Sequence, residues 1–316
     1  MEKLKRSLGS FVVPLLSIIL AFVIGGIIMA ALGANPFDAV KYLFQGAFGS
    51  KANIGTTLTK ATPLMFTSLC ACFAYKCGVF NLGGEGQFLM GSIAAFVTAY
   101  FSGVTGFAGV LLALLAGTLA GGIWGLIPGV LKITRGQNEM IISIMLNYVA
   151  TLFMGVLYTN WIRDASVPQT PAVDDLVKLP RVIQGMRFTW GFVIAVVVGL
   201  LLYYVLFWTS GGFKLRAVGY NMTASRFNGI HVKRCMLTSF IVSGAIAGLG
   251  GGAELLGTQF RLINGYGAGY GFDGVAMALI GQLHPIATVI VALFFAALRV
   301  GSTTMQAATG VPTSVS

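Results

Sequence analysis

Long apolar runs separated by shorter polar segments are the main pattern along this chain. We interpret nine of them as membrane spans, at residues 11–32, 61–80, 88–101, 107–131, 140–158, 190–208, 236–256, 275–283 and 286–300. A helix needs about 20 predominantly apolar residues to cross the hydrocarbon core of a bilayer. The pattern therefore predicts an all-α, polytopic membrane protein with about nine spans, some of them short and broken by glycine.

The polar segments between these runs differ in length and character. Residues 33–60 interleave aromatic and polar positions, which predicts a short amphipathic helix along the outer membrane surface. Residues 159–189 are the longest polar stretch and are predicted to form an extracellular loop. Residues 209–235, a segment rich in basic side chains, are predicted to form a cytoplasmic loop. We expect all of these segments to belong to one transmembrane domain over residues 1–316.

Composition agrees with a membrane protein. Of the 316 residues, 56% are hydrophobic and 9% are charged, whereas a soluble domain carries about 25% charged residues. The formal net charge is +11, but the basic residues flank apolar runs, so membrane lipid and not nucleic acid is the expected partner. The four cysteines have no nearby histidine to complete a metal site, and we expect no metal and no cofactor.

Charge placement predicts the orientation of the chain. With the N-terminus in the cytoplasm, the inner loops are nearly free of acids, whereas the basic residues of the outer segments lie mostly in long segments that also contain acids. Positive charge in short loops marks the cytoplasmic side. The inner basic residues are then Lys3, Lys5, Arg6, Lys76, Lys132, Arg135, Lys214, Arg216, Arg226, Lys233 and Arg234.

One short motif places polar groups between two apolar runs. Asn81, Glu85 and Gln87 alternate with helix-destabilising glycines. Irregular backbone at membrane depth is tolerated only where protein buries it or where it lines a water-filled cavity. A carboxylate at that depth is a functional candidate by default. Alternatively, Glu85 caps a helix or lies at the cytoplasmic interface, and the sequence does not decide between these interpretations.

Further polar residues accompany two other segments. Glu254 and Asp273 flank the second glycine-rich break, and paired broken segments of this kind are typical of transporters with internal repeats. Asn138, Glu139 and Asn147 open the run at 140–158, where Glu139 is favourably placed for the helix dipole. We expect Asn81, Glu85, Gln87, Asn147 and Asp273 to line or shape the transport pathway.

Two series of glycines recur at every fourth position. Gly117, Gly121, Gly125 and Gly129 form one series, and Gly244, Gly248 and Gly252 form the other. On a helix this spacing exposes backbone along one face and favours close helix packing. The chain has no phosphate-binding loop and no nucleophile–base arrangement, so we expect no enzyme activity. Active transport would then need a partner ATPase or an ion gradient acting through Glu85, Glu254 or Asp273.

Three ordered motifs resemble the permease subunits of bacterial ABC importers in the branched-chain amino acid and simple sugar permease family. They are Phe80-Asn-Leu-Gly-Gly-Glu-Gly-Gln-Phe-Leu-Met-Gly91, Leu215-Arg-Ala-Val-Gly-Tyr-Asn221 and Phe272-Asp-Gly-Val-Ala-Met-Ala-Leu-Ile-Gly281, the last followed by His284-Pro285. The resemblance covers roughly residues 10–312. The Gly-Glu-Gly-Gln sequence is most similar to the nucleoside and simple-sugar branch.

The resemblance implies partners and a mechanism. It implies a separate ABC ATPase, a second permease subunit that is usually a paralogue, an extracellular substrate-binding lipoprotein, and a location in the bacterial plasma membrane. The segment 211–229 resembles the family's ATPase-coupling loop, with a short helix at 222–228 that Gly219 and Gly229 would terminate. We expect Gly219, Asn221, Ala224, Arg226 and Gly229 to carry the coupling.

The chain departs from the family pattern at one end. Such permeases continue after the Gly-Val-Pro at 310–312 into one more apolar span, which this sequence lacks. Either the sequence is truncated or the last helix is dispensable. The residues do not identify the solute, and the alternative of an ion-driven secondary transporter for a small polar solute stays open at this point.

Overall fold

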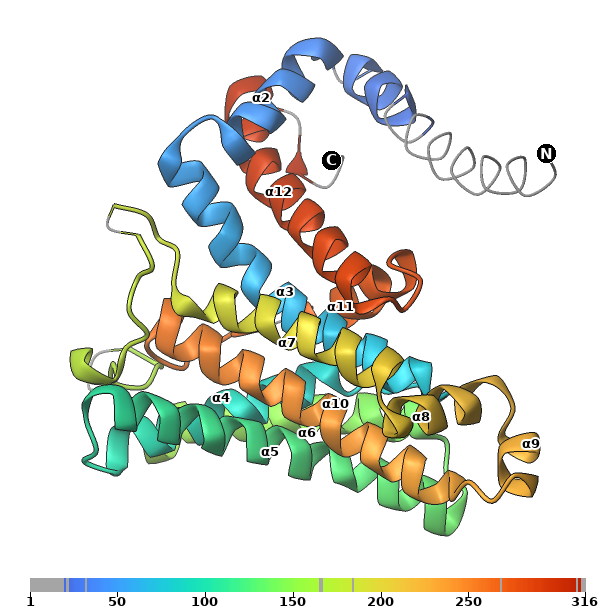
Figure 1. The fold of residues 1–316 in the computed structure, drawn as a ribbon. Coiled ribbons are helices and arrows are strands. Elements are labelled where there is room, and N and C mark those ends of the chain that lie inside the picture. The colour runs from blue at the N-terminus through green and yellow to red at the C-terminus, as the bar shows by residue number, and fades with distance from the viewer. Residues whose placement is uncertain are drawn as a thin grey trace, which may run out of the picture. The chain divides into compact units, whose positions relative to one another are not determined.

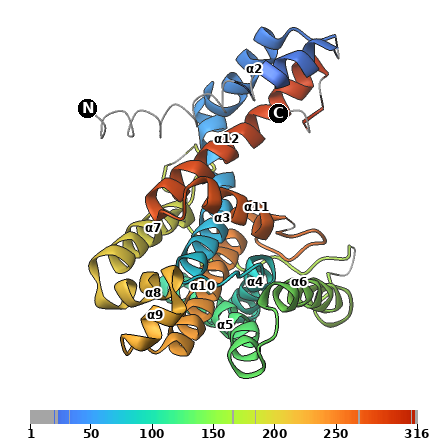
Figure 2. The same ribbon diagram turned by 90° about the vertical axis from the view of Figure 1, so that its right-hand side faces the viewer.

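The described part of the chain folds mostly into helices (Figures 1 and 2). The computed structural model describes residues 20, 23–31, 33–164, 167–183, 185–267, 269–310 and 312–313, where backbone pairing of the β type is limited to two isolated bridges. The prediction of an all-α protein is confirmed. A helix at Val23–Ala31 is followed by α2 (Pro36–Phe48), α3 (Lys51–Lys76), α4 (Gly84–Phe101), α5 (Gly106–Arg135), α6 (Glu139–Val156), η1 (Leu157–Trp161), η2 (Asp175–Val177), α7 (Trp190–Trp208), α8 (Ser210–Tyr220), α9 (Met222–Phe227), α10 (Val232–Glu254), η3 (Leu255–Gln259), α11 (Tyr270–Ile280) and α12 (Pro285–Thr309).

Five of the described helices are long and apolar enough to cross a membrane. They are α5, α6 continued by η1, α7, α10 continued by η3, and α12. The count rises to six if Val23–Ala31 and α2, bent by 113°, form one broken span. Helices α3 and α4 also occupy predicted spans, so the figure of about nine spans stays a prediction. Most of the predicted first span and the basic residues before it lie outside the described residues.

The helices divide into two compact units. One unit comprises Met1–Thr57 with Phe295–Ser316, and the other comprises Leu58–Phe294. Among the described residues of the first unit, Ala39 and Leu43 of α2 pack with Met305 of α12 and with Met29. The short helix predicted within residues 33–60 is present as α2, and its place along the outer membrane surface stays a prediction. The single domain expected over residues 1–316 stays a prediction.

In the larger unit, α4, α5 and α10 make the closest helix contacts. A Cβ added at Gly121 would overlap the backbone of Gly244 and Gly248, and one at Gly91 would overlap Gly248. Gly117 lies against the carbonyl oxygens of both Gly91 and Gly248. The predicted contact faces are therefore confirmed: the two glycine series meet, and backbone packs directly on backbone.

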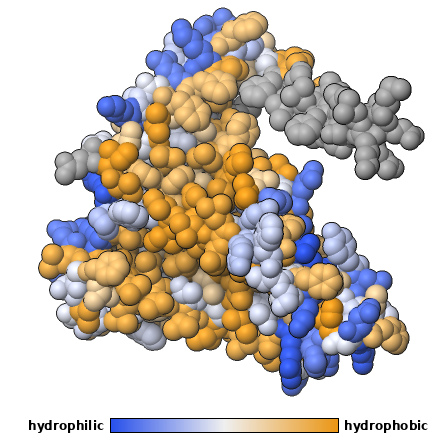
Figure 3. All heavy atoms as spheres, in the orientation of Figure 1, coloured by the Kyte–Doolittle hydropathy of each residue, from blue (hydrophilic) through white to orange (hydrophobic). Residues whose placement is uncertain are grey.

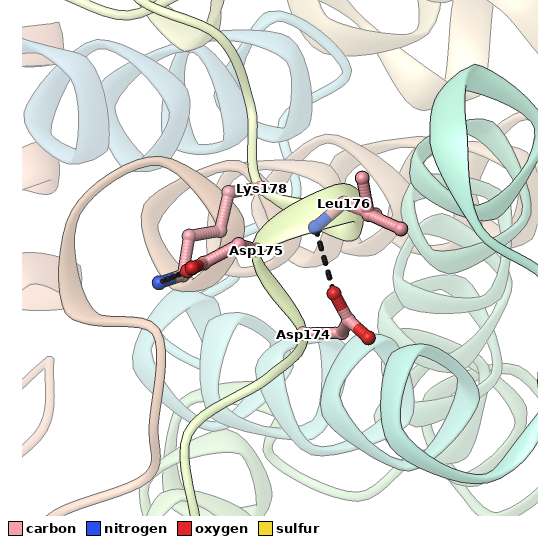
Figure 4. A network of polar contacts seen from close by, with 4 residues as sticks. All are labelled: Asp174, Asp175, Leu176 and Lys178. Carbon is pink, nitrogen blue, oxygen red and sulfur yellow. Dashed lines mark hydrogen bonds and ion pairs between the residues drawn. The ribbon is translucent and has the colours of Figure 1, made fainter.

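The long polar loop packs against the segment that follows α10. Backbone hydrogen bonds join Leu179 N to Leu256 O (2.8 Å) and Val173 N to Phe260 O (2.9 Å). Within the loop, Asp174 accepts a hydrogen bond from the backbone N–H of Leu176 (2.9 Å), and Lys178 pairs with Asp175 (Figure 4). The loop is thus ordered by the second broken segment and by its own short 3₁₀ turn η2.

Exposed side chains separate into an apolar and a polar region within the larger unit (Figure 3). Hydrophobic residues cover the outer face of α7, where Val197, Leu200 and Leu201 are each more than half exposed. Hydrophilic residues gather at the end of the unit that carries α8 and α9. This distribution fits helices surrounded by lipid with their connecting segments in water.

Candidate functional site

The motif at residues 81–87 forms a compact turn between α3 and α4. Asn81 and Gln87 face each other and exchange two amide hydrogen bonds, each 3.0 Å long. Asn81 Oδ1 also accepts a hydrogen bond from the backbone N–H of Gly83 (2.9 Å). Both side chains are 1% exposed. The irregular backbone that the glycines predicted is thus buried in protein, and the side-chain amides of Asn81 and Gln87 are paired with each other.

Two other helices bind to this turn. Asn81 Nδ2 donates to Ser243 Oγ (2.9 Å) near the middle of α10. From α6, Asn147 Oδ1 accepts from Gly86 N (2.8 Å) and its Nδ2 donates to Leu82 O (2.9 Å). Because Ser243 lies halfway along a helix long enough to cross a bilayer, we expect the network to lie at membrane depth. It ties together three helices that lie side by side in both views (Figures 1 and 2).

Glu85 joins the network to the second broken segment. Its Oε2 accepts a hydrogen bond from Gly269 N (3.1 Å), immediately before α11, and a Cβ at Gly271 would collide with Glu85. Asp273 lies in the first turn of α11, as Glu85 does in α4, and the two half-buried carboxylates interact electrostatically. Two helix N-termini, each with one acid, therefore meet here. The helix dipoles stabilise both negative charges.

The five predicted pathway residues are brought into one region but not into equivalent roles. The side-chain amides of Asn81, Gln87 and Asn147 bind protein partners, which favours a role in shaping the pathway and not in lining it. Glu85 and Asp273, in contrast, are only half-buried. Sequence reasoning missed Ser243. A serine at a buried position of a glycine-rich helix was the available signal, but its partner lies 162 residues away.

Asn81→Ala should lower the thermal stability of the purified permease. The substitution leaves the Gln87 amide, the Ser243 hydroxyl and the Gly83 N–H without the partner they share, and each unpaired buried group costs about 1–3 kcal/mol. The measurement is Tm in detergent by scanning fluorimetry.

The matched control for this variant is Asn138→Ala. Asn138 is an exposed asparagine that makes one helix-capping hydrogen bond to Met140 N (3.0 Å), worth about 1 kcal/mol. Equal Tm losses in the two variants would contradict a special role for the buried network.

Two further acids lie outside this network. Glu139 is 7% exposed and pairs with Lys132 (2.7 Å), while the neighbouring Asn138 provides the side-chain cap of α6. Glu254 is 2% exposed, accepts from Gln259 Nε2 (3.3 Å), and lies where α10 changes into the π-helical turn η3. Neither acid reaches the turn at residues 81–87 through a described hydrogen bond.

The predicted coupling segment contains two helices. The second, α9, begins after Asn221, whose side chain accepts from Ala224 N (2.9 Å), and ends before Gly229, whose φ is +76°. A positive φ favours glycine. Ser225 is the buried residue of α9, whereas Phe227 is 89% exposed. The predicted short helix is confirmed, with its end one residue earlier at Phe227.

The first half of the segment differs from the prediction. Residues 210–220 form the helix α8, which packs through Gly212, Leu215 and Val218, so this part of the segment is helical, while its place in a cytoplasmic loop stays a prediction. Gly219 does not terminate the coupling helix, because it lies inside the last turn of α8. A Cβ at Gly219 would overlap the carbonyl of Lys76, so this glycine lets α8 close on the end of α3.

Comparison with known proteins identifies relatives over almost the whole chain. Residues 53–315 match the family described as branched-chain amino acid transport system / permease component. The guanosine ABC transporter permease protein NupP of Bacillus subtilis is 34% identical over 98% of this chain and 90% of its own length. The glucose ABC transporter permease protein TsgB13 of Haloferax volcanii is 31% identical over 96% and 83%.

A second Bacillus subtilis protein is also similar. The guanosine ABC transporter permease protein NupQ is 27% identical over 77% of this chain and 79% of its own length. No solved structure matches the chain. Two guanosine ABC transporter permease proteins of one organism are thus similar to this chain in sequence.

Proposed function

This chain belongs to the permease family of branched-chain amino acid transport systems, and from that membership we propose that it imports nucleosides or related sugar-containing solutes. It is a membrane-spanning permease subunit of an ABC importer, and the ion-driven alternative is not supported by its relatives. Guanosine and glucose appear in the names of two relatives, and both molecules contain a sugar ring that carries several hydroxyl groups. That shared chemistry is why we extend the proposal to sugar-containing solutes in general.

One observation carries the proposed coupling to an ATPase: α9 projects from the helix bundle and is almost entirely exposed (Figure 1). Phe227, the last residue of α9, is 89% exposed, and Tyr220, the last residue of α8, is 86% exposed. Large exposed aromatic side chains on a fixed short helix are typical of protein interfaces. We assign them, with Asn221, Ala224, Arg226 and Gly229, to the contact with a separate ATPase in the cytoplasm.

The remaining partners follow the general arrangement of ABC importers. The pair of guanosine permease proteins in Bacillus subtilis supports a second, paralogous permease next to this chain. A substrate-binding lipoprotein would deliver the solute on the outer side, with the N-terminus of this chain in the cytoplasm of a bacterial cell. Asn81, Gln87 and Asn147 would hold the broken helices in place, and Glu85 and Asp273 would border the pathway.

Phe227→Ala should reduce guanosine uptake about 30-fold, because truncating an aromatic anchor of an interface costs about 2 kcal/mol. The assay uses proteoliposomes that contain the assembled importer and measures both guanosine uptake and guanosine-stimulated ATP hydrolysis. Unlabelled glucose and deoxyribose nucleosides serve as competitors to define the solute class.

Phe107→Ala is the matched control, since Phe107 is 83% exposed on α5 and lies outside the coupling segment. It should leave uptake unchanged. Normal uptake by Phe227→Ala would exclude the α9 contact, and uptake that needs no ATPase would exclude the importer proposal itself.

A further inference from the structure

A second polar cluster lies at the end of α3, where α7, α8 and the turn before α12 meet. The ring of Phe207 is its centre. Arg216 Cζ lies 4.9 Å and Lys76 Nζ lies 5.9 Å from the ring centroid, and the imidazole of His284 lies 5.4 Å away. Two cations and an imidazole from three separate elements thus converge on one aromatic ring.

No acid balances these cations in the described part of the chain. The two ion pairs found there are Lys132–Glu139 and Lys178–Asp175, so neither involves Lys76 or Arg216. Arg216 Nε is buried and has no hydrogen-bond partner. An unpaired buried donor on a charged group is costly, and two like charges beside one ring repel. Both penalties would be relieved by an anion.

The backbone next to the cluster is strained. Gln282 and Leu283 have φ values of +53° and +54°, in the left-handed region that non-glycine residues avoid. Strain of this kind is found at ligand sites, where the surrounding structure maintains it. The turn directs His284 toward Tyr203 and Phe207, and His284 Nδ1 accepts from Ala287 N (3.5 Å). The remaining ring nitrogen, Nε2, is then a donor.

The surroundings of the cluster are those of a membrane surface. Trp208, next to Phe207, is 71% exposed, and Phe213 on α8 is 61% exposed. Of these two, the exposed tryptophan is the residue type that marks the lipid headgroup level. Basic pockets between helices at the cytoplasmic surface bind anionic lipid headgroups. A guanidinium is suited to phosphate because its donors form a planar fork.

We propose that Lys76 and Arg216 bind the phosphate group of an anionic membrane lipid against Phe207, with His284 as a further donor. The inference rests on the proposed function only in placing this cluster in the cytoplasmic leaflet. Because Gly219 of α8 packs on the Lys76 carbonyl, the lipid holds α8 against the end of α3. α8 leads directly into α9, so the bound lipid stabilises the base of the coupling segment.

The test measures lipid association and not transport. The assembled importer is reconstituted in phosphatidylcholine with spin-labelled phosphatidylglycerol, and electron spin resonance gives the association constant relative to spin-labelled phosphatidylcholine. Arg216→Gln and Lys76→Gln should each lower this selectivity at least about fivefold, because each removes a charge-assisted hydrogen bond to the bound phosphate. Arg216→Lys keeps the charge and should lose less. Lys214→Gln, an exposed lysine on the same helix, should change little.

The outcomes distinguish a lipid phosphate from a soluble phosphate, and they distinguish failure of the lipid site from failure of the proposed ATPase coupling. An equal loss in Lys214→Gln, or no loss in Arg216→Gln, overturns the site. In lipid-free detergent, inorganic phosphate should change the Tm of the wild type and of Arg216→Gln by the same amount. A larger rise in the wild type would mean that the ligand is a soluble phosphate, and it would exclude the lipid. Lipid selectivity does not depend on ATP hydrolysis, so failure of the coupling proposal leaves this result readable.

Discussion

Gly229→Pro is expected to abolish both uptake and solute-stimulated ATP hydrolysis in the assembled importer. The φ of Gly229 is +76°, whereas proline is fixed near −65°. Proline would also remove the hydrogen bond from Gly229 N to Arg226 O (3.1 Å), which closes the end of α9. The helix would then lose its fixed orientation toward the ATPase. Transport of guanosine into proteoliposomes and release of phosphate are measured on the same preparation.

The control for this experiment is Gly136→Pro. Gly136 has a φ of +63°, and its N–H bonds to Lys132 O (3.1 Å), so the substitution damages a comparable helix end outside the coupling segment. If Gly136→Pro stops transport to the same degree, the effect of Gly229→Pro reflects general destabilisation. If Gly229→Pro transports normally, α9 does not transmit the ATPase movement.

Gly248→Ala is expected to destabilise the permease by about 3 kcal/mol, at the upper end of the usual cost of overpacking. The added Cβ would overlap Gly117 O and approach Gly121, both of which are backbone and cannot move aside as a side chain can. The purified protein should show a lower Tm and a smaller monodisperse fraction in size-exclusion chromatography.

Gly155→Ala provides the comparison, because it adds the same methyl group to a glycine within a membrane helix. At Gly155 the nearest atom to an added Cβ is Tyr158 Oη at 3.9 Å, an ordinary contact. The higher helix propensity of alanine should then increase stability by about 1 kcal/mol. A similar Tm for both variants would show that α4, α5 and α10 do not need bare backbone at their contact.

The amino-acid sequence predicted those features that follow from local pattern. The helix at Trp190–Trp208 begins and ends where its apolar run does, and the spacing of Gly117, Gly121, Gly244 and Gly248 correctly identified two faces that pack. Long apolar runs leave few alternatives in a bilayer, since every backbone group must be paired within the chain. Fold class and contact faces were therefore accessible without coordinates.

The sequence was less informative where a structure depends on distant partners. Helix α8 was not predicted, because glycines and cations obscure its apolar face, which consists of Gly212, Leu215 and Val218. The motif around Asn81 was recognised, but its dependence on Ser243 was not. Nothing local distinguishes a polar side chain that lines a pathway from one that holds two helices together.

The bare contact between α4, α5 and α10 also limits how the larger unit can change shape. Helices slide past one another by exchanging side-chain rotamers at their interface, and backbone resting on backbone has no rotamers to exchange. We therefore expect these three helices to move together as one rigid block. We expect any sliding of helices in the larger unit to occur at an interface filled by flexible side chains. The contact of Gly199 of α7 with the side chains of Leu69 and Val289 is such an interface.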